Sequence, residues 1–256
     1  NVLRFNKKVW DGLFKEGKVK KNIYQSRSEA EANLLSWVDT KFGLFFIYAD
    51  AGSGKTNLLV EMQKQYYHKD ITSLLIRANR VSNASITESL QDILDLQQGF
   101  DFTILKDLGF SRGNPFIILI DGGNEHNTPV SFLTEILNFL KKYSGGFIKV
   151  VLSWRAELSS ELPPINGSFS NLIYSDNTLN RETNYLAQKA YYLKEFNNQE
   201  LEQAWDKYAK GPNRKYKLQF KLEDLAYYDR GLIRLLHNPF NLNIFLSLFD
   251  NKRPLP

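Results

Sequence analysis

Apolar residues in this chain follow two patterns: short unbroken runs, and longer stretches in which they recur every three to four residues. The runs have the length of buried strands, and the stretches are typical of amphipathic helices. Strands are predicted at residues 44–49, 72–78, 116–121, 147–153 and 172–174, and helices at 26–39, 55–67, 85–96 and 130–143. Because strands and helices alternate, the sequence predicts an α/β fold with a parallel five-stranded sheet flanked by helices.

The pattern changes near residue 180, where the alternation of strands and helices stops. Helices are predicted at 185–196, 198–209 and 222–249, the last interrupted by Asn238-Pro239. This part reads as a small all-helical lid domain. At the other end, residues 1–21 form a basic amphipathic pattern. We therefore expect a linker or docking helix at 1–22, a nucleotide-binding domain at 23–179 and the lid at 180–256.

The amino-acid composition excludes several kinds of site. The chain has 256 residues, 43% of them hydrophobic. It contains no cysteine, which excludes disulfides and thiolate metal sites, and its three histidines are scattered along the sequence and form no ligand cluster. The apolar runs are too short to span a bilayer and no secretory signal is visible, so we expect a cytoplasmic protein.

The net charge of +5 is unevenly distributed. Residues 1–22 carry seven Lys/Arg against Asp11 and Glu16, which equals the whole net charge. A second cluster comprises Lys207, Lys210, Arg214, Lys215, Lys217 and Lys221. We interpret both clusters as solvated faces or as a lid over phosphates; binding of nucleic acid or of an acidic partner domain is the alternative.

Residues 49–56 carry the first functional motif, because they match the phosphate-loop pattern GxxxxGK[ST] with Ala in the first position. Turns at Gly52 and Gly54 let backbone N–H groups point inward, and the next helix adds its positive end. Lys55 is expected to reach the β- and γ-phosphates and Thr56 to hold Mg²⁺. The expected nucleotide-binding residues here are Ala51, Gly52, Ser53, Gly54, Lys55, Thr56 and Asn57.

Two further strand ends carry charged residues. Asp121 ends the run Phe-Ile-Ile-Leu-Ile-Asp, and the carboxyl ends of parallel strands meet at one edge, so Asp121 is expected to hold Mg²⁺ together with Thr56. Glu125 follows four residues later and is a candidate to orient or deprotonate the attacking water. Arg155, after the next buried run, is placed to bind the γ-phosphate.

These motifs, with Leu152-Ser153-Trp154-Arg155 and the segment His237-Asn238-Pro239-Phe240, resemble in order and spacing the signal-transduction ATPases with numerous domains (STAND), in particular their NACHT-like branch. The resemblance covers about residues 23–249. It implies that Asp121 is the Mg²⁺ ligand, Glu125 the water-orienting acid, Arg155 the γ-phosphate sensor and Pro239 a contact to the nucleotide base. Asn124 replaces an acid of the family, which bears on hydrolysis more than on binding.

The family resemblance also implies a biological role. Its members bind ADP or ATP with Mg²⁺, self-associate in the ATP-bound form, and carry an N-terminal effector and C-terminal sensor repeats that this chain would lack. Some act in immune or anti-phage defence. No guanine-reading Asn-Lys-x-Asp motif is present, which favours adenine. Two alternatives stay open: a DNA-remodelling ATPase of the AAA+ type, and a nucleotide-binding scaffold that has lost hydrolysis.

Overall fold

The computed structural model describes residues 2–19, 24–81, 85–162, 169–175, 189–209, 218 and 220–250. The chain divides into two compact units. The sheet unit comprises Asn1–Val19, Ser28–Asp50 and Lys55–Leu193, and the helical unit comprises Lys20–Arg27, Ala51–Gly54 and Lys194–Pro256. The three-segment division expected from the sequence stays a prediction.

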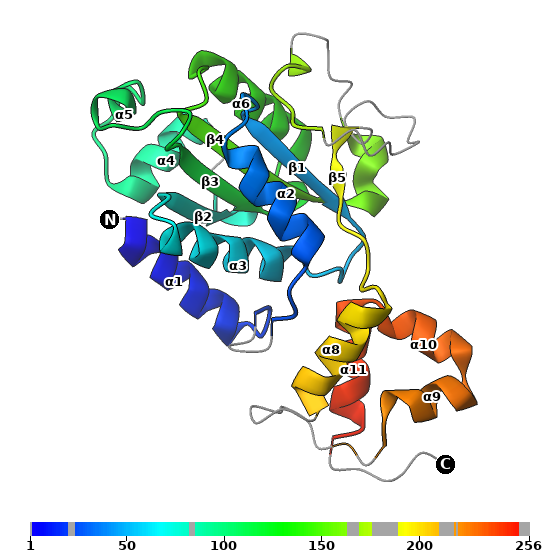
Figure 1. Ribbon diagram of the computed structural model, residues 1–256. Coiled ribbons are helices and arrows are strands. Elements are labelled where there is room, and N and C mark those ends of the chain that lie inside the picture. Colours follow the sequence, from blue (N-terminus) through cyan, green and yellow to red (C-terminus); the bar gives the residue numbers. More distant parts are fainter. Residues whose placement is uncertain are drawn as a thin grey trace. The chain divides into compact units, whose positions relative to one another are not determined.

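The sheet unit contains a parallel five-stranded sheet, as the sequence predicted. Its strands are β1 (Leu44–Ala49), β2 (Ser73–Arg77), β3 (Phe116–Asp121), β4 (Ile148–Arg155) and β5 (Tyr191–Tyr192), in the order β2-β3-β4-β1-β5 (Figure 1). Every residue of β1 and β3 is buried, which explains why both strands read as unbroken apolar runs. Because these strands are parallel, the carboxyl ends of β1, β3 and β4 lie at the same edge of the sheet.

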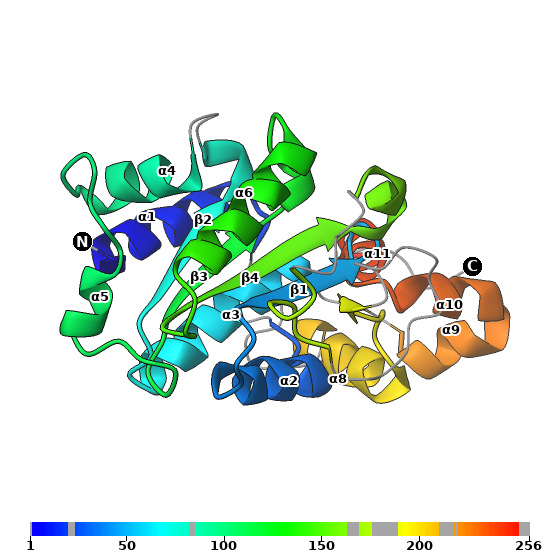
Figure 2. The ribbon, with the colours of Figure 1, turned by 90° about the horizontal axis from the view of Figure 1, so that it is seen from above.

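Helices cover both faces of this sheet (Figure 2). The helices α2 (Ser28–Val38) and α3 (Lys55–His68) share a buried cluster with one face, to which α1 (Val2–Lys15) contributes Leu13. The helices α4 (Ile86–Leu94) and α6 (Pro129–Lys142) share another cluster with the opposite face, and the short α5 (Ile104–Asp107) adds Leu105 at its margin. Ser85 caps α4 by accepting a hydrogen bond from the Glu88 N–H.

α1 lies along the outer edge of the sheet. Asn6 is buried, donates to the Ser73 carbonyl (2.8 Å) and accepts from the Leu75 N–H (3.0 Å). These bonds satisfy backbone groups of β2 that an edge strand leaves unpaired. Trp10 also donates to Gln63 on α3 (2.6 Å). As a result, the turn that follows α1 is fixed near the carboxyl end of β2.

Two sequence predictions in the fifth strand region are wrong. Residues 172–174 form only an isolated bridge, between Ile173 and Leu44, and the fifth strand is β5, where Tyr191 and Tyr192 pair with Ile47 and Tyr48. The helix predicted at 185–196 is wrong for residues 191–196, which form β5 and an irregular segment; Lys189 is helical, and residues 185–188 lie outside the described part of the chain. Aromatic residues pair readily across strands, and this tertiary contact prevails over the local helical spacing.

The helical unit contains α8 (Asn198–Ala209), α9 (Leu222–Tyr228), α10 (Arg230–Leu236) and α11 (Pro239–Leu248). Its core includes Trp205, Leu225, Leu242 and Phe245. Asp229 caps α10 and Asn238 caps α11, so the predicted helix 222–249 is interrupted twice. Of the second basic cluster, Lys210, Arg214, Lys215 and Lys217 lie outside the described residues. Among the helices described, none is long and apolar enough to cross a membrane.

Candidate nucleotide site

The predicted phosphate loop is a turn between β1 and α3. Gly52 and Gly54 have φ angles of +79° and +95°, a region that L-residues with a side chain rarely adopt. Ser53 between them is buried, and its Oγ has no hydrogen-bond partner among the described residues. A buried hydroxyl without a partner is costly, so this loop fits a ligand that supplies hydrogen-bond acceptors.

Lys55, the first residue of α3, folds back onto the loop. Its Nζ donates to the carbonyls of Ala49 (2.7 Å) and Asp50 (2.8 Å). Burial lowers the pKa of Lys55 to about 8, while the nearby carboxylates of Glu157 and Asp121 act to raise this pKa and the Arg155 guanidinium to lower it. The structure thus places the ammonium of Lys55 within electrostatic reach of both Asp121 and Arg155.

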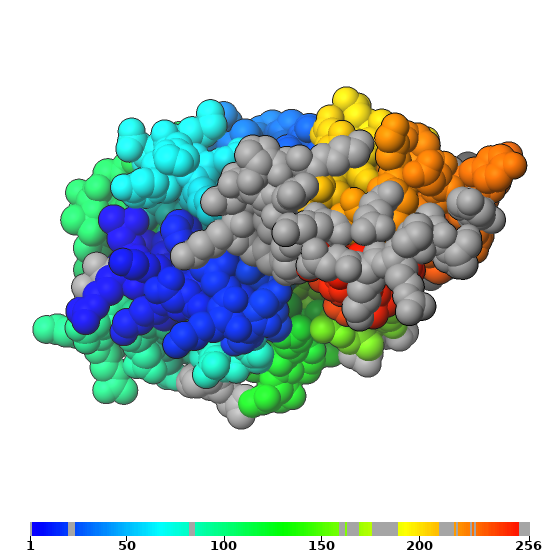
Figure 3. Space-filling view, turned by 90° about the horizontal axis from the view of Figure 1, so that it is seen from below, coloured from blue at the N-terminus to red at the C-terminus, as the bar shows by residue number. Residues whose placement is uncertain are grey.

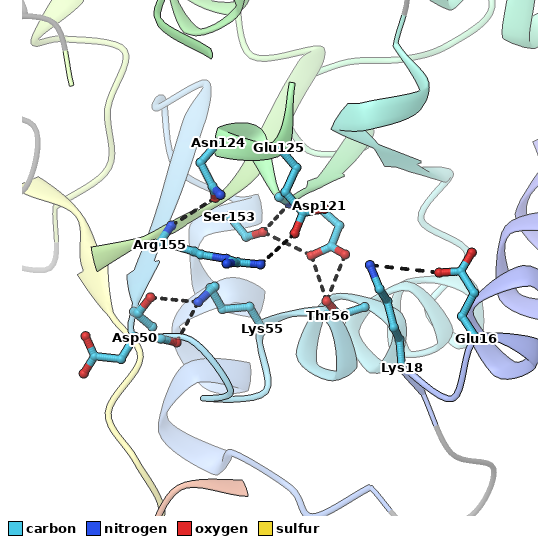
Figure 4. A network of polar contacts seen from close by, with 12 residues as sticks. Glu16, Lys18, Asp50, Lys55, Thr56, Asp121, Asn124, Glu125, Ser153 and Arg155 are labelled. Atoms are coloured by element: carbon cyan, nitrogen blue, oxygen red, sulfur yellow. Dashed lines mark hydrogen bonds and ion pairs between the residues drawn. The ribbon is translucent and has the colours of Figure 1, made fainter. Parts of the chain in front are cut away.

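Thr56 and Asp121 meet directly (Figure 4). The Thr56 hydroxyl lies 2.9 Å from Oδ2 and 3.1 Å from Oδ1 of Asp121. Ser153 on β4 donates to Asp121 Oδ1 (3.2 Å) and accepts from the Gly122 N–H (2.8 Å). Burial raises the pKa of Asp121, and the hydrogen bond from Thr56 opposes this effect.

Glu125 and Arg155 form an ion pair, with 3.1 Å between Arg155 Nη2 and Glu125 Oε1 (Figure 4). Glu125 ends a short 3₁₀ turn (Gly123–Glu125) that follows β3, and Arg155 is the last residue of β4. Asn124 accepts a hydrogen bond from the Arg155 backbone N–H (3.2 Å). Asn124 therefore holds the end of β4.

Within the helical unit, three successive loop carbonyls each accept a hydrogen bond. Asn238 Nδ2 donates to the Ala51 carbonyl (3.1 Å) and the Phe240 N–H to the Gly52 carbonyl (3.3 Å). Arg27 Nη1 donates to the Ser53 carbonyl (3.1 Å). Because these carbonyls are occupied, the loop backbone is held in place by hydrogen bonds from Arg27, Asn238 and Phe240.

The remaining predicted site residues lie at the margins. Pro239 is the first residue of α11, and its Cγ lies 3.8 Å from the position that a Cβ on Gly54 would take. Asn57 on α3 donates to the Lys18 carbonyl (3.2 Å). The contact of Pro239 with a base, and the catalytic roles of Glu125 and Arg155, stay predictions.

Sequence reasoning missed several residues that contact the site, among them Ser153, Arg27 and Asn238. Ser153 belongs to a quoted motif but had no role there. Arg27 is buried, pairs with Glu200 (3.4 Å) and lies 5.0 Å from the Phe196 ring centroid, so it joins parts of the chain that are far apart in sequence. No local pattern marks such a residue. Asn238 could have been found as a cap before Pro239.

The oxygen atoms at the strand ends fit Mg²⁺. Hard cations of this kind prefer carboxylate and hydroxyl oxygens, and the Thr56 hydroxyl and Asp121 carboxylate already lie within hydrogen-bond distance of each other. In the part of the chain that is described, no group of three or more His, Cys, Asp or Glu residues could hold a metal ion by itself.

Comparison with known proteins gives fold-level likeness only. No protein-family model matches the chain, and no curated protein matches it. Among solved structures, it is similar to Cdc6p from Pyrobaculum aerophilum (12% identity, TM-score 0.47, covering 72% of this chain and 52% of that one). It is also similar to a Walker-type ATPase of Pyrococcus abyssi (12%, TM-score 0.47, 88% and 72%). A third is the Thermotoga maritima RuvB Holliday junction branch migration motor (11%, TM-score 0.38, 71% and 50%).

The chain thus spans about half the length of the first and third of these structures. Its own geometry defines the class more directly: a loop with two left-handed glycines between β1 and α3, and a carboxylate at the end of β3 bonded to the threonine after the loop lysine. This is the fold of the P-loop NTPases.

Proposed function

We propose that this chain binds ADP or ATP with Mg²⁺ and acts as a nucleotide-controlled switch with slow, conditional hydrolysis. The observation that carries the proposal is the contact between Thr56 and Asp121, which joins the phosphate loop to the end of β3. A structural role alone does not account for a buried carboxylate beside a threonine and a lysine that both belong to a phosphate-loop motif.

Each residue has a distinct task in this proposal. The N–H groups of the loop and the Lys55 ammonium bind the phosphates, and the Thr56 hydroxyl and the Asp121 carboxylate hold the metal. When bound, Mg²⁺ neutralises phosphate charge. Ser153 keeps the Asp121 carboxylate oriented, since it bonds both Asp121 and the following N–H.

Conditional hydrolysis follows from the pair formed by Glu125 and Arg155. The two side chains form an ion pair, with 3.1 Å between Arg155 Nη2 and Glu125 Oε1. A γ-phosphate competes for the guanidinium, and the released Glu125 carboxylate can then orient a water molecule. Turnover is therefore expected to depend on how fully the triphosphate displaces this ion pair.

The proposed switch rests on the hydrogen bonds to the loop carbonyls. Asn238, Phe240 and Arg27 bond residues of the same loop that binds phosphate, and the peptide chain runs directly from that loop into α3. A change in loop occupancy is then coupled to the helical unit. By resemblance to the STAND ATPases, we extend this to ATP-driven self-association that activates an effector under control of a sensor, as in immune or anti-phage defence.

A DNA-remodelling ATPase is a second candidate, favoured by one observation. The basic side chains of Arg4, Lys7, Lys8 and Lys15 on α1 are exposed, and Figure 3 shows α1 in dark blue at the surface. Such a surface can bind nucleic-acid phosphates. Turnover that is stimulated by DNA and falls steeply with added salt would favour this candidate over the switch.

A scaffold without hydrolysis is the third candidate, because Asn124 bonds the Arg155 backbone where the family has an acid. Normal ADP and ATP binding with no phosphate release from either the monomer or an ATP-induced oligomer would support it.

The experiment that tests nucleotide binding is thermal or chemical unfolding with ADP and Mg²⁺. A ligand at 100 times its dissociation constant stabilises the native protein by about 2.7 kcal/mol. Lys55→Ala is expected to abolish this stabilisation, whereas Lys64→Ala, a control on the same helix, keeps it. Equal stabilisation of wild type and Lys55→Ala would refute the assignment of the loop.

A further inference from the structure

The turn after α1 brings a second lysine to the metal-binding end of the site. Lys18 lies in this turn, and in Figure 4 its ammonium lies between the carboxylates of Asp121 and Glu16. Burial raises the pKa of Asp121, and the hydrogen bonds from Thr56 and Ser153 and, to a smaller extent, the positive charge of Lys18 act to lower it. Lys18 belongs to the basic segment 1–22, which the sequence analysis interpreted as a solvated face or a lid over phosphates, with no role assigned to Lys18 itself.

The backbone of this turn is fixed, so the position of Lys18 is defined. Asn57, the residue after Thr56, donates to the Lys18 carbonyl (3.2 Å). The next residue, Val19, is buried, and its N–H bonds the Leu13 carbonyl (3.3 Å). The side chain of Lys18 is 40% exposed, so the ammonium also contacts solvent.

An acidic residue lies on the other side of the ammonium. Lys18 Nζ is 4.0 Å from Glu16 Oε2, and Arg77 at the end of β2 bonds Glu16 Oε1 (2.6 Å). Arg77 therefore holds Glu16 in place. Lys18 has two carboxylates within electrostatic reach, Asp121 at the site and Glu16 beside it.

We propose that Lys18 is a built-in counter-ion of Asp121 that competes with Mg²⁺, and that Glu16 receives the ammonium when the metal binds. This inference rests on the proposed nucleotide site. A cation near Asp121 stabilises the carboxylate in the metal-free protein, and the same charge repels an incoming divalent ion. Lys18 then sets the Mg²⁺ concentration at which nucleotide becomes tightly held.

The test measures the affinity for ribose-labelled fluorescent ADP at increasing Mg²⁺ concentration, from EDTA to saturation. Lys18→Met removes the charge and keeps the length of the side chain, and the Mg²⁺ midpoint is expected to fall about five-fold, the scale of a partly exposed ion pair. Lys8→Met, at an exposed position of α1, is the matched control and leaves the midpoint unchanged.

Glu16→Gln should shift the midpoint in the opposite direction, because the ammonium loses its second partner. Glu16→Gln also removes the charged partner of Arg77. The double variant Lys18→Met/Glu16→Gln should therefore have the same Mg²⁺ midpoint as Lys18→Met if the effect of Glu16→Gln acts through Lys18 and not through Arg77. Circular dichroism and the unfolding midpoint of each variant verify that it is folded.

The outcomes separate this inference from the proposed function. If ADP binds and Mg²⁺ tightens it, but Lys18→Met has the wild-type midpoint, the role of Lys18 is refuted and the nucleotide site stands. An ADP affinity of the wild type that does not change with Mg²⁺ concentration would also refute the role of Lys18. If wild type binds no ADP at all, both proposals fall.

Discussion

Two lysines at opposite ends of the sheet show how a similarly lowered pKa can accompany different roles. Lys149, near the start of β4, is fully buried and donates to the carbonyls of Trp37 (3.2 Å), Thr40 (2.6 Å) and Phe42 (3.0 Å). Lys55, at the carboxyl end of β1, also donates to backbone carbonyls. Burial lowers the pKa of each to about 8.

The difference lies in what surrounds the two ammonium groups. Lys149 closes the turn between α2 and β1 and lies 5.0 Å from the Trp37 ring centroid. Lys55 faces the charged groups Glu157, Arg155 and Asp121, which come from the ends of two other strands and the segment after β4. A lowered lysine pKa therefore does not identify a functional site in this protein; the convergence of several charged side chains does.

The largest expected effect concerns the carboxyl end of the sheet. Glu125→Gln should bind ATP as wild type does but lose turnover by about 1000-fold, because the amide cannot accept a proton from water. Phosphate release under saturating ATP measures this, with Glu135→Gln on α6 as the control. Wild-type turnover in Glu125→Gln would mean that another group positions the water.

The next effect concerns the amino end. Lys149→Met should lower the free energy of unfolding by about 3 kcal/mol, because the Thr40 and Phe42 carbonyls lose their donor, while the Trp37 carbonyl still accepts from Thr40. Stabilisation by ADP should be the same as in wild type. Chemical denaturation with and without ADP measures both quantities. If Lys149→Met folds normally but is no longer stabilised by ADP, Lys149 contributes to nucleotide binding and the contrast with Lys55 is wrong.

A pair of glycines tests the phosphate loop. A Cβ at Gly52 would lie 2.7 Å from Phe240 Cβ and 2.8 Å from Asn238 Oδ1, whereas Gly99, with nearly the same φ, has nothing within 4 Å. Gly99→Ala should cost about 1 kcal/mol for the left-handed backbone alone, and Gly52→Ala about 2 kcal/mol or more. Equal losses in denaturation would show that the loop does not contact α11 in solution.

The smallest effect is the pH dependence that Lys149 adds to stability. Its pKa is lower in the folded protein than the ordinary 10.5, so the unfolded chain binds more protons between the two values and stability rises with pH there. From about pH 7.5 to about pH 9, the wild type should gain about 1 kcal/mol relative to Lys149→Met. A constant difference in unfolding free energy would contradict the lowered pKa.

Much of the fold could be predicted because its signals are local. The buried run at 116–121 matches β3 residue for residue, the strand predicted from residue 44 begins where β1 begins, and the glycines of the loop have the backbone conformation that the motif requires. Both strands are covered on two faces, so their sequences contain no competing pattern.

The remainder depends on contacts between distant segments. β5 has two residues and owes its place to pairing with β1, which no local spacing reveals. Arg27 and Asn238 reach loop carbonyls 26 and 187 residues away along the chain. Lys18 looked like part of a solvated basic face because its approach to Asp121 depends on how α1 follows the edge of the sheet.

The most direct measurement is a crystal structure of the chain with ADP and Mg²⁺. We expect the phosphates to accept hydrogen bonds from the N–H groups of the loop and from Lys55, and the metal to be held by Thr56 Oγ1 and, directly or through water, by Asp121. Phosphates bound away from residues 51–56, or a metal that contacts neither Thr56 nor Asp121, would contradict the account.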